Sequence, residues 1–381
     1  MQVVSPDFVK NKKVLLRYDI DVALVQKTED GRQKTEVAED FKLKAGLDTL
    51  ELCLENASKV IIIGHLGRPF ATVEDEKIGN PASLSAKPVC EWFKQKLGMD
   101  LEFAESLEKA SQSTKKLVLL ENIRFFHGEV PGLEYHTTCT SKTCDIDFAH
   151  KLASLGEVYI NEAFSAHNVG ASTTMVPTLL PHAAGLHFIK EVETLLTVRN
   201  NPKKPFVAIM GGAKVKDKLP VIEVLAKKAD AVLVGGKIAW ELTKHEGDPS
   251  SLIAPQDDNL RLDIVRKLSN VLVGKLNSEG TDIAEETTES WRNLIVKAKM
   301  IVWNGPLGKF EDPKNDQSKK VAEMVLESNA EIVVGGGDTV SLLGGLGMLG
   351  KYEEKGFVSV GGGAMLKLLA DGTLLTIEAL K

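Results

Sequence analysis

The sequence predicts an α/β protein of two Rossmann-like parallel-sheet lobes, joined by a helix and able to bend at that hinge. Short β-branched runs alternate with helix-like segments along the chain, which is typical of parallel sheets covered on both faces. The length of 381 residues also favours two domains, because one domain usually holds about 100–200 residues.

The composition is that of an ordinary globular protein, with 43% hydrophobic and 26% charged residues. A formal net charge of -6 argues against a nucleic-acid or membrane-surface partner, because both favour a basic excess. No apolar run approaches the ~18–20 residues that span a bilayer, and the first residues do not form a signal peptide. Four cysteines are too few for a disulfide scaffold. We therefore expect a cytoplasmic protein.

In the first half of the chain, four β-rich runs each end in a polar or charged group. The runs cover residues 14–16, 60–63, 117–120 and 158–160, and helical spacing of apolar residues predicts helices over 42–55 and 88–97. Ligands of parallel sheets bind beyond the carboxyl ends of the strands. The side chains expected to line this crevice suit a small anionic ligand: Asp19, Asp21, His65, Arg68 and Arg124. Any one of them alone is better explained as a solvated loop charge or a local ion pair, but their occurrence together at repeated strand ends favours a ligand site.

Beyond residue 180 this pattern stops, and residues 188–198 form one amphipathic segment that ends at Asn200-Asn201-Pro202. We interpret it as a helix that connects the two lobes. The predicted organisation is an N-terminal lobe over 1–182, a connecting segment over 183–200 and a C-terminal lobe over 201–367.

In the second half, five β-rich runs each enter a glycine turn. The runs cover residues 206–210, 231–234, 300–303, 332–334 and 358–360. Glycine lets the backbone bend tightly and approach a ligand closely, and a helix N-terminus offers unpaired N–H groups to phosphate. Amides at several strand ends suit a polyanion such as a nucleoside triphosphate.

Three charged side chains follow these glycines. Lys214 and Lys218 are four residues apart, which predicts one face of a helix, where they could neutralise phosphate or form a solvated surface. Asp338 follows Gly335-Gly336-Gly337 and could hold Mg²⁺ or cap a helix.

Two further patterns carry less weight. Residues 345–352 satisfy G-x-G-x-x-G, but they follow a helical segment, so we interpret them as a helix end and turn. The second pattern, a zinc site or a loop with free thiols, involves His127, His136, Cys139 and Cys144.

One basic strand-end crevice and one glycine-amide crevice, on two hinged lobes, favour phosphoryl transfer. Closure would bring acceptor and nucleotide together and expel water. No Ser-His-Asp or Cys-His set stands out, so catalysis would rest on positioning and charge stabilisation.

Motifs along nearly the whole chain resemble those of the phosphoglycerate kinase family. They cover residues 17–19, 64–69, 120–125, 211–218, 303–311, 335–339 and 361–364. The resemblance implies reversible transfer of the acyl phosphate of 1,3-bisphosphoglycerate to MgADP, giving ATP and 3-phosphoglycerate, by a two-lobed and usually monomeric enzyme of glycolysis. It also implies that the last residues, 368–381, return to the N-terminal lobe.

The resemblance further implies roles for particular residues. Triose phosphate would contact Asp19, Asp21, His65, Arg68 and Arg124. The catalytic groups implied are Lys42, Lys214, Gly336 and Gly337. The nucleotide would meet Gly212, Lys214, Lys218, Gly235, Asn304, Glu311, Gly337, Asp338 and Thr339, with Asp338 as the contact to Mg²⁺.

The chain departs from the family pattern at both crevices. Asp21 replaces an asparagine, Lys42 an arginine and Asn168 another arginine, with His167 and Lys44 as candidates to fill the space of the last. Asp21 and Asn168 together make the pocket less positive by about two charges, and one lost charge-assisted contact is worth roughly 1.5–3 kcal/mol. On the nucleotide side, Lys237 replaces a glycine, Val360 replaces a threonine, and residues 282–287 lack a Gly-Pro pair.

These departures keep alternatives open. An active phosphoglycerate kinase is the main hypothesis. A noncatalytic or weakly active relative that binds nucleotide or a protein partner is the second, and a kinase for another small acid is the third.

Overall fold

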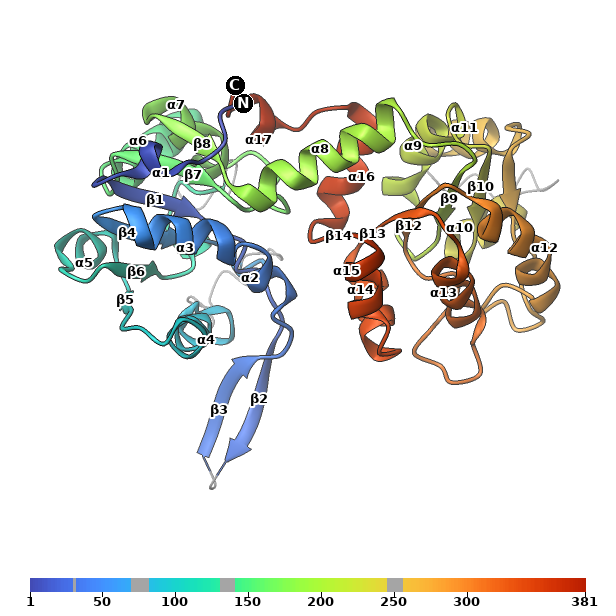
Figure 1. Ribbon diagram of the computed structural model, residues 1–381, viewed down its shortest axis with the longest axis horizontal. Coiled ribbons are helices and arrows are strands. Elements are labelled where there is room, and N and C mark those ends of the chain that lie inside the picture. The colour runs from blue at the N-terminus through green and yellow to red at the C-terminus, as the bar shows by residue number, and fades with distance from the viewer. Residues whose placement is uncertain (30–31, 70–81, 131–140, 245–255) are drawn as a thin grey trace. The chain divides into compact units, whose positions relative to one another are not determined.

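The computed structural model describes residues 1–29, 32–69, 82–130, 141–244 and 256–381 (Figure 1). The chain divides into two compact units, Met1–Lys190 with Leu374–Lys381, and Glu191–Thr373. It passes from the first unit to the second within helix α8 (Leu186–Asn200), which contains the predicted helix over 188–198. The unit boundaries thus fall at 190/191 and 373/374. The sequence predicted a connecting segment over 183–200 and a C-terminal tail from residue 368.

The N-terminal unit holds a six-stranded parallel sheet in the order β5-β6-β4-β1-β7-β8. Its strands are β1 (Lys13–Arg17), β4 (Lys59–Ile63), β5 (Glu102–Ala104), β6 (Leu117–Leu120), β7 (Val158–Asn161) and β8 (His182–Ala184). The central strands are continuous apolar runs because helices cover both of their faces. β5 and β8 were not predicted, since three residues are too short to form a recognisable pattern.

Helices of this unit alternate with its strands. They are α1 (Pro6–Val9), α2 (Phe41–Ala45), α3 (Leu47–Asn56), α4 (Lys87–Leu97), α5 (Leu107–Gln112), α6 (Ser141–Ala153), α7 (Val176–Leu179) and α17 (Leu375–Glu378). The single helix predicted over 42–55 is wrong, because Gly46 separates α2 from α3. A Cβ at Gly46 would lie 2.7 Å from the Tyr18 ring, so a larger residue would collide with the core.

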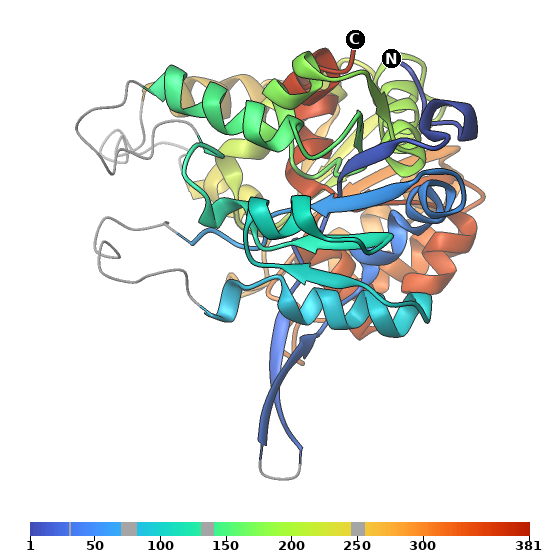
Figure 2. The same ribbon diagram turned by 90° about the vertical axis from the view of Figure 1, so that its left-hand side faces the viewer.

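An antiparallel hairpin of β2 (Leu24–Glu29) and β3 (Arg32–Val37) projects from the body of this unit (Figure 2). The sequence analysis did not predict it. Glu36 on β3 pairs with Lys34 beside it and with Lys27 on β2, at 2.7 and 2.9 Å. The position of the hairpin matters for the site, because the chain runs from β1 through the hairpin directly into α2, which carries Lys42.

The C-terminal unit holds a second six-stranded parallel sheet, in the order β11-β10-β9-β12-β13-β14. Its strands are β9 (Phe206–Met210), β10 (Ala231–Val234), β11 (Val271–Val273), β12 (Met300–Asn304), β13 (Glu331–Gly335) and β14 (Gly356–Ser359). Its remaining helices are α9 (Val215–Ala226), α10 (Gly236–Lys244), α11 (Gln256–Arg266), α12 (Glu285–Lys297), α13 (Gln317–Glu327), α14 (Gly337–Gly345), α15 (Leu349–Lys355) and α16 (Gly362–Asp371). Of the predicted helix end and turn over 345–352, the end of α14 at Gly345 and the turn after it are confirmed, but α15 begins at Leu349 and was not predicted.

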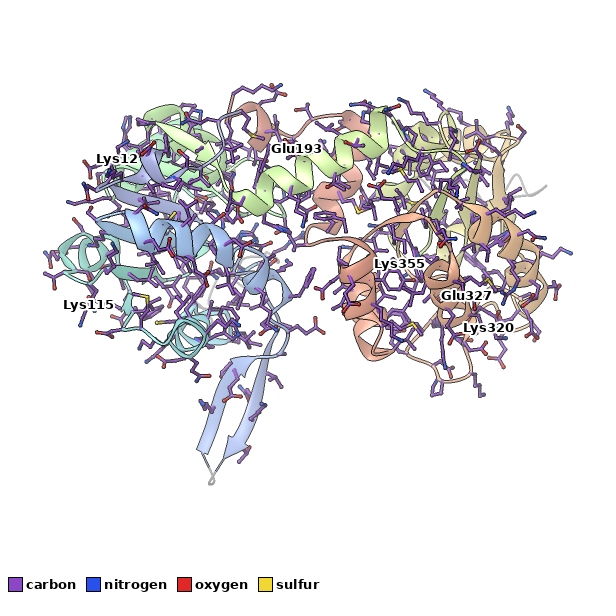
Figure 3. All side chains as sticks on the ribbon, viewed as in Figure 1. Lys12, Lys115, Glu193, Lys320, Glu327 and Lys355 are labelled. Atoms are coloured by element: carbon purple, nitrogen blue, oxygen red, sulfur yellow. The ribbon has the colours of Figure 1, made fainter. Side chains whose placement is uncertain are left out.

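Charged side chains such as Lys115 and Glu327 lie at the surface of the two units (Figure 3). Ion pairs between such exposed groups add little stability, because water screens them and both side chains lose freedom. Among the described residues, no helix is both long and apolar enough to cross a membrane. The two parallel sheets with covering helices confirm the predicted α/β fold class.

Candidate functional site

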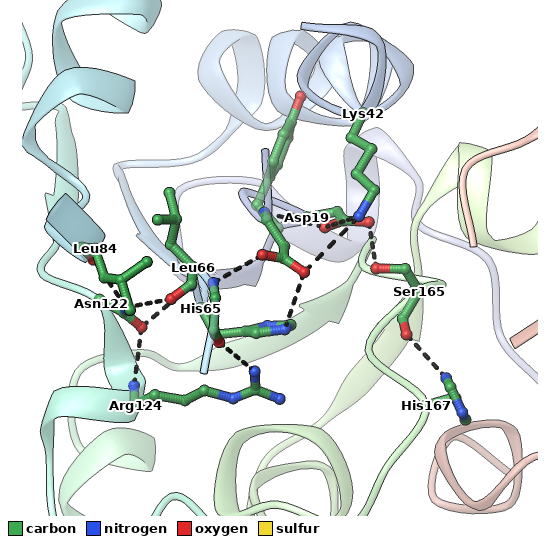
Figure 4. Close-up of polar contacts among 12 residues, drawn as sticks. Asp19, Lys42, His65, Leu66, Leu84, Asn122, Arg124, Ser165 and His167 are labelled. Carbon is green, nitrogen blue, oxygen red and sulfur yellow. Dashed lines mark hydrogen bonds and ion pairs between the residues drawn. The ribbon is translucent and has the colours of Figure 1, made fainter. Parts of the chain in front are cut away.

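The residues predicted to line the basic crevice of the N-terminal unit lie where four neighbouring strands end. β6, β4, β1 and β7 are adjacent and parallel, so the residues that follow them meet at one edge of the sheet. Asp19 follows β1, His65 follows β4, Arg124 follows β6 and Ser165 follows β7, and Figure 4 shows these side chains gathered with Lys42 of α2.

Two carboxylates hold the lysine of this cluster. Lys42 Nζ lies 3.8 Å from Asp19 Oδ1 and 4.0 Å from Asp21 Oδ2. Asp19 is buried and accepts a hydrogen bond from Ser165 Oγ at 2.5 Å. Asp21 Oδ1 accepts one from the Gly67 amide at 2.8 Å. Asp21 therefore adds a second negative charge to the cluster and occupies the Gly67 amide.

The loop that carries His65 and Arg68 is held in place by Asn122. The Asn122 side chain accepts from the Leu66 amide at 3.2 Å and donates to the Leu66 carbonyl at 2.7 Å (Figure 4). Asn122 Oδ1 also accepts from the Arg124 amide at 3.1 Å, and Arg124 Nη1 donates to the Gly67 carbonyl at 2.5 Å. Arg68 is exposed, so its guanidinium can reach a ligand from solvent.

His65 is buried and contacts a residue that the sequence analysis did not place in the site. Arg17 Nη2 lies 2.7 Å from His65 Nδ1, and the Asp21 carboxylate lies 3.8 Å from His65 Nε2. Burial and the neighbouring charge of Arg17 lower the pKa of His65 well below its usual value of 6.5. His65 is thus a neutral ring at pH 7. The sequence feature that could have identified Arg17 as a site residue is its position as a charged residue at the end of an otherwise apolar strand.

The two candidates for the space of the missing arginine differ. Lys44 Nζ pairs with Asp40 at 2.9 Å on the solvent side of α2. His167 lies at the edge of the cluster, with Nδ1 2.9 Å from the Ser165 carbonyl (Figure 4). Asn168 is exposed, and its backbone carbonyl accepts from Thr173 Oγ1. His167 is therefore the better candidate of the two.

The glycine crevice of the C-terminal unit forms at the ends of β9, β10, β12 and β13. A cavity of about 430 Å³ lies there, and Gly212, Gly236, Glu311 and Asp338 are among the residues that line it. Gly305 has a φ of +91°, and a Cβ on it would lie 2.3 Å from the Gly211 carbonyl oxygen, so any larger residue would strain this turn.

The two predicted lysines do not share a helix face. Lys214 is exposed and immediately precedes α9, whereas Lys218 is buried within it. Lys218 Nζ donates to the carbonyls of Gly211 and, at 3.3 Å, Asn304. Burial lowers its pKa from 10.5 to about 8, and the nearby Asp338 carboxylate partly offsets that effect. The expectation of one common face is wrong because the helix begins only at Val215.

The turn after β13 buries one of its two polar residues and exposes the other. Thr339 is buried, and its hydroxyl accepts from the Gly305 amide at 2.7 Å and donates to the Gly335 carbonyl at 3.0 Å. It therefore supports the turn. Asp338 is exposed in the first turn of α14, and Gly337 begins that helix with open space around it.

Other predicted nucleotide contacts lie at the neighbouring strand ends. Asn304 and Gly235 are buried at the ends of β12 and β10, whereas Glu311 is exposed at the cavity. The sequence analysis missed Trp240, which lines the cavity one helical turn after Lys237 on α10. That spacing was the signal that could have found it.

Among the residues that the structure describes, no three His, Cys, Asp or Glu side chains are placed to share a metal ion. His136 and Cys139 of the zinc hypothesis lie outside the described residues. Asp338 is a single exposed carboxylate beside backbone amides. That fits Mg²⁺, which keeps several waters and uses one or two carboxylates together with substrate phosphates.

Known proteins resemble this chain along its whole length. A model of the family described as Phosphoglycerate kinase matches residues 6–269 and 250–372. The phosphoglycerate kinase of Solibacter usitatus is 35% identical, with 98% of this chain and 97% of the relative covered. That of Dictyoglomus turgidum is 31% identical, with 98% and 96% covered.

Solved structures agree with these relatives. The phosphoglycerate kinase of Coxiella burnetii superposes with a TM-score of 0.74 at 27% identity, over 98% of this chain and 96% of that one. The enzyme of Pyrococcus horikoshii superposes with a TM-score of 0.78 at 24% identity, over 100% and 98%, which supports the fold.

Proposed function

Because this chain belongs to the phosphoglycerate kinase family, whose members transfer phosphate between a nucleotide and a carboxyl acceptor, we propose that it interconverts 1,3-bisphosphoglycerate plus ADP with 3-phosphoglycerate plus ATP in glycolysis. The observation that supports this most is the presence in one chain of a basic strand-end crevice and a glycine-amide strand-end crevice. The reaction needs both, since one must hold an anionic acid and the other a polyphosphate.

The N-terminal crevice supplies the groups for the triose phosphate. Lys42, Arg68 and Arg124 offer positive charge, and His65 offers a neutral N–H. Asp19 fixes Lys42 and is itself held by Ser165, so the lysine is oriented before a ligand arrives. Lysine at 42 gives a single point charge where an arginine would give a planar fork, so it stabilises a transferring phosphoryl group with less directional control.

The C-terminal crevice supplies the groups for the nucleotide. Backbone amides at Gly336 and Gly337 would receive phosphate oxygens, and Lys214 is exposed in the same unit. The Gly212 amide donates to the Pro306 carbonyl at 2.6 Å, so it would have to leave that carbonyl before it could bind phosphate. Lys218 becomes available to phosphate only if its ammonium leaves the carbonyls of Gly211 and Asn304. Mg²⁺, held by Asp338 together with the nucleotide, would supply positive charge beside the phosphates.

Transfer in line requires donor and acceptor in one water-poor site, so we also propose that ligand binding closes the two units by bending at α8. We propose further that the protein is monomeric and cytoplasmic and needs neither a nucleic acid nor a membrane. Size-exclusion chromatography with light scattering would test the first of these points.

A coupled assay with MgADP and 1,3-bisphosphoglycerate tests the proposed reaction. We expect ATP formation that depends on both substrates and is abolished in a Lys214→Ala variant. Absence of turnover in a protein that still binds MgADP in calorimetry would refute the proposal. That outcome would support the second candidate, a nucleotide-binding relative without turnover, which the Asp21 contact with the Gly67 amide favours.

A further inference from the structure

Arg17 makes a contact that fixes the protonation of His65. Arg17 is 1% exposed, and its Nη2 lies 2.7 Å from His65 Nδ1. A guanidinium has five N–H donors and no acceptor, and it stays protonated in proteins. His65 Nδ1 must therefore accept this hydrogen bond with its lone pair, which leaves the ring proton on Nε2.

The guanidinium cannot turn away from His65, because its other groups are engaged. Arg17 Nη1 donates to the Tyr18 carbonyl at 2.8 Å, and Nε donates to Ser172 Oγ at 3.0 Å. Ser172 in turn donates to the buried carboxylate of Glu129, from Oγ at 2.7 Å and from its amide at 3.0 Å. A continuous chain of buried hydrogen bonds thus runs from Glu129 to the His65 ring, and buried networks of this kind are rigid when every member is satisfied.

Four cations near His65 also oppose a positive ring, whereas one facing carboxylate favours it. The cations are Arg17, Arg124, Lys42 and Arg68, and the carboxylate that faces Nε2 is that of Asp21 at 3.8 Å. Burial and these cations lower the pKa of His65, in agreement with a ring that carries one proton. That proton lies on the side of Asp21, Lys42 and the crevice.

We propose that Arg17 is a positioning residue, which holds His65 as the neutral Nε2–H tautomer so that it serves the crevice as a hydrogen-bond donor. In this role His65 donates a directional hydrogen bond to one oxygen of the anionic ligand, whereas Lys42, Arg68 and Arg124 supply the positive charge. His65 then neither contributes positive charge nor transfers a proton during the reaction. The identity of the ligand rests on the proposed function, but the tautomer does not.

The tautomer is measured directly by long-range ¹H–¹⁵N correlation spectra of the imidazole rings, with the His65 signals assigned through their loss in His65→Gln. We expect an unprotonated Nδ1 and a protonated Nε2 from about pH 6 to about pH 8 in the wild-type protein. In Arg17→Met, the pKa of His65 should rise toward about 6.5 and both tautomers should appear. An imidazolium or an Nδ1–H ring in the wild type near pH 7 overturns the proposal, whether or not the Arg17 variant folds.

A matched pair of variants tests what the tautomer does for ligand binding. Glutamine at 65 can place an N–H near the position of Nε2, whereas asparagine can replace only Nδ1. We expect His65→Gln to keep 3-phosphoglycerate affinity within about threefold and His65→Asn to lose about tenfold or more. Equal losses in the two folded variants would contradict a donor role. If the wild type binds no 3-phosphoglycerate, the proposed function fails, while the spectra still decide the tautomer.

Discussion

Asp21 is expected to weaken the binding of the triose phosphate, and Asp21→Asn should reverse this. The carboxylate accepts from the Gly67 amide at 2.8 Å and lies 3.8 Å from His65 Nε2 and 4.0 Å from Lys42 Nζ. An anionic ligand that approaches the same donors meets this negative charge. Asparagine keeps the shape and an oxygen for the Gly67 amide, so the change removes charge with little effect on packing.

The size of the effect follows from the exposure of Asp21. Two like charges about 4 Å apart repel by about 1 kcal/mol in water and about 4 kcal/mol in a site of intermediate dielectric constant. The Asp21 side chain is 37% exposed, which places the repulsion toward the lower value. A gain of about 1–2 kcal/mol corresponds to a KM for 3-phosphoglycerate that is about tenfold lower. Adding Asn168→Arg should lower it further by restoring a cation.

Initial rates with MgATP and varied 3-phosphoglycerate measure this change. Asp7→Asn is the matched control, because it removes the same charge from exposed helix α1. The advantage of Asp21→Asn over the wild type should shrink as salt is raised, since salt screens exposed charges. A KM that stays within twofold of the wild type, or an equal change in Asp7→Asn, would show that Asp21 does not oppose the ligand.

Three further predictions concern other parts of the two crevices. Lys218→Met should weaken MgADP binding about tenfold or more. Above about pH 8, calorimetry should detect proton uptake when MgADP binds the wild type but not when it binds Lys218→Met, because phosphate favours the charged lysine. Gly305→Ala should lower the free energy of unfolding in urea by about 1–3 kcal/mol, since its Cβ meets the Gly211 carbonyl at a φ of +91°. Gly350→Ala is the control, because Gly350 lies in a helix with open space around it and the change should not destabilise the protein. The pKa of His65 is lowered in the folded state, so the unfolded state takes up the proton first and stability should fall as the pH drops below about 6.5. His65→Gln should lack that component, and unfolding curves of identical acid slope would contradict it.

Much of the fold was predictable because local patterns and chain connectivity agree. The apolar runs that became β1, β4 and β9 were recognised from their β-branched residues, and a parallel sheet then brings their carboxyl ends together. The short edge strand β11 and the hairpin of β2 and β3 were missed. Three residues carry no periodicity, and the hairpin has little buried apolar surface to mark its two strands.

By itself, the sequence determined which residues end the strands and that glycines serve one crevice while charged side chains serve the other. Strand ends and glycine turns depend on neighbours along the chain. Only the tertiary structure decided the state of each group: His65 is neutral because it is buried and faces Arg17, Lys218 is buried against carbonyls, and Asp21 accepts a hydrogen bond from the Gly67 amide. Burial and charge at a strand end come from residues distant in sequence, such as Ser172 beside Arg17, so no local pattern contains them.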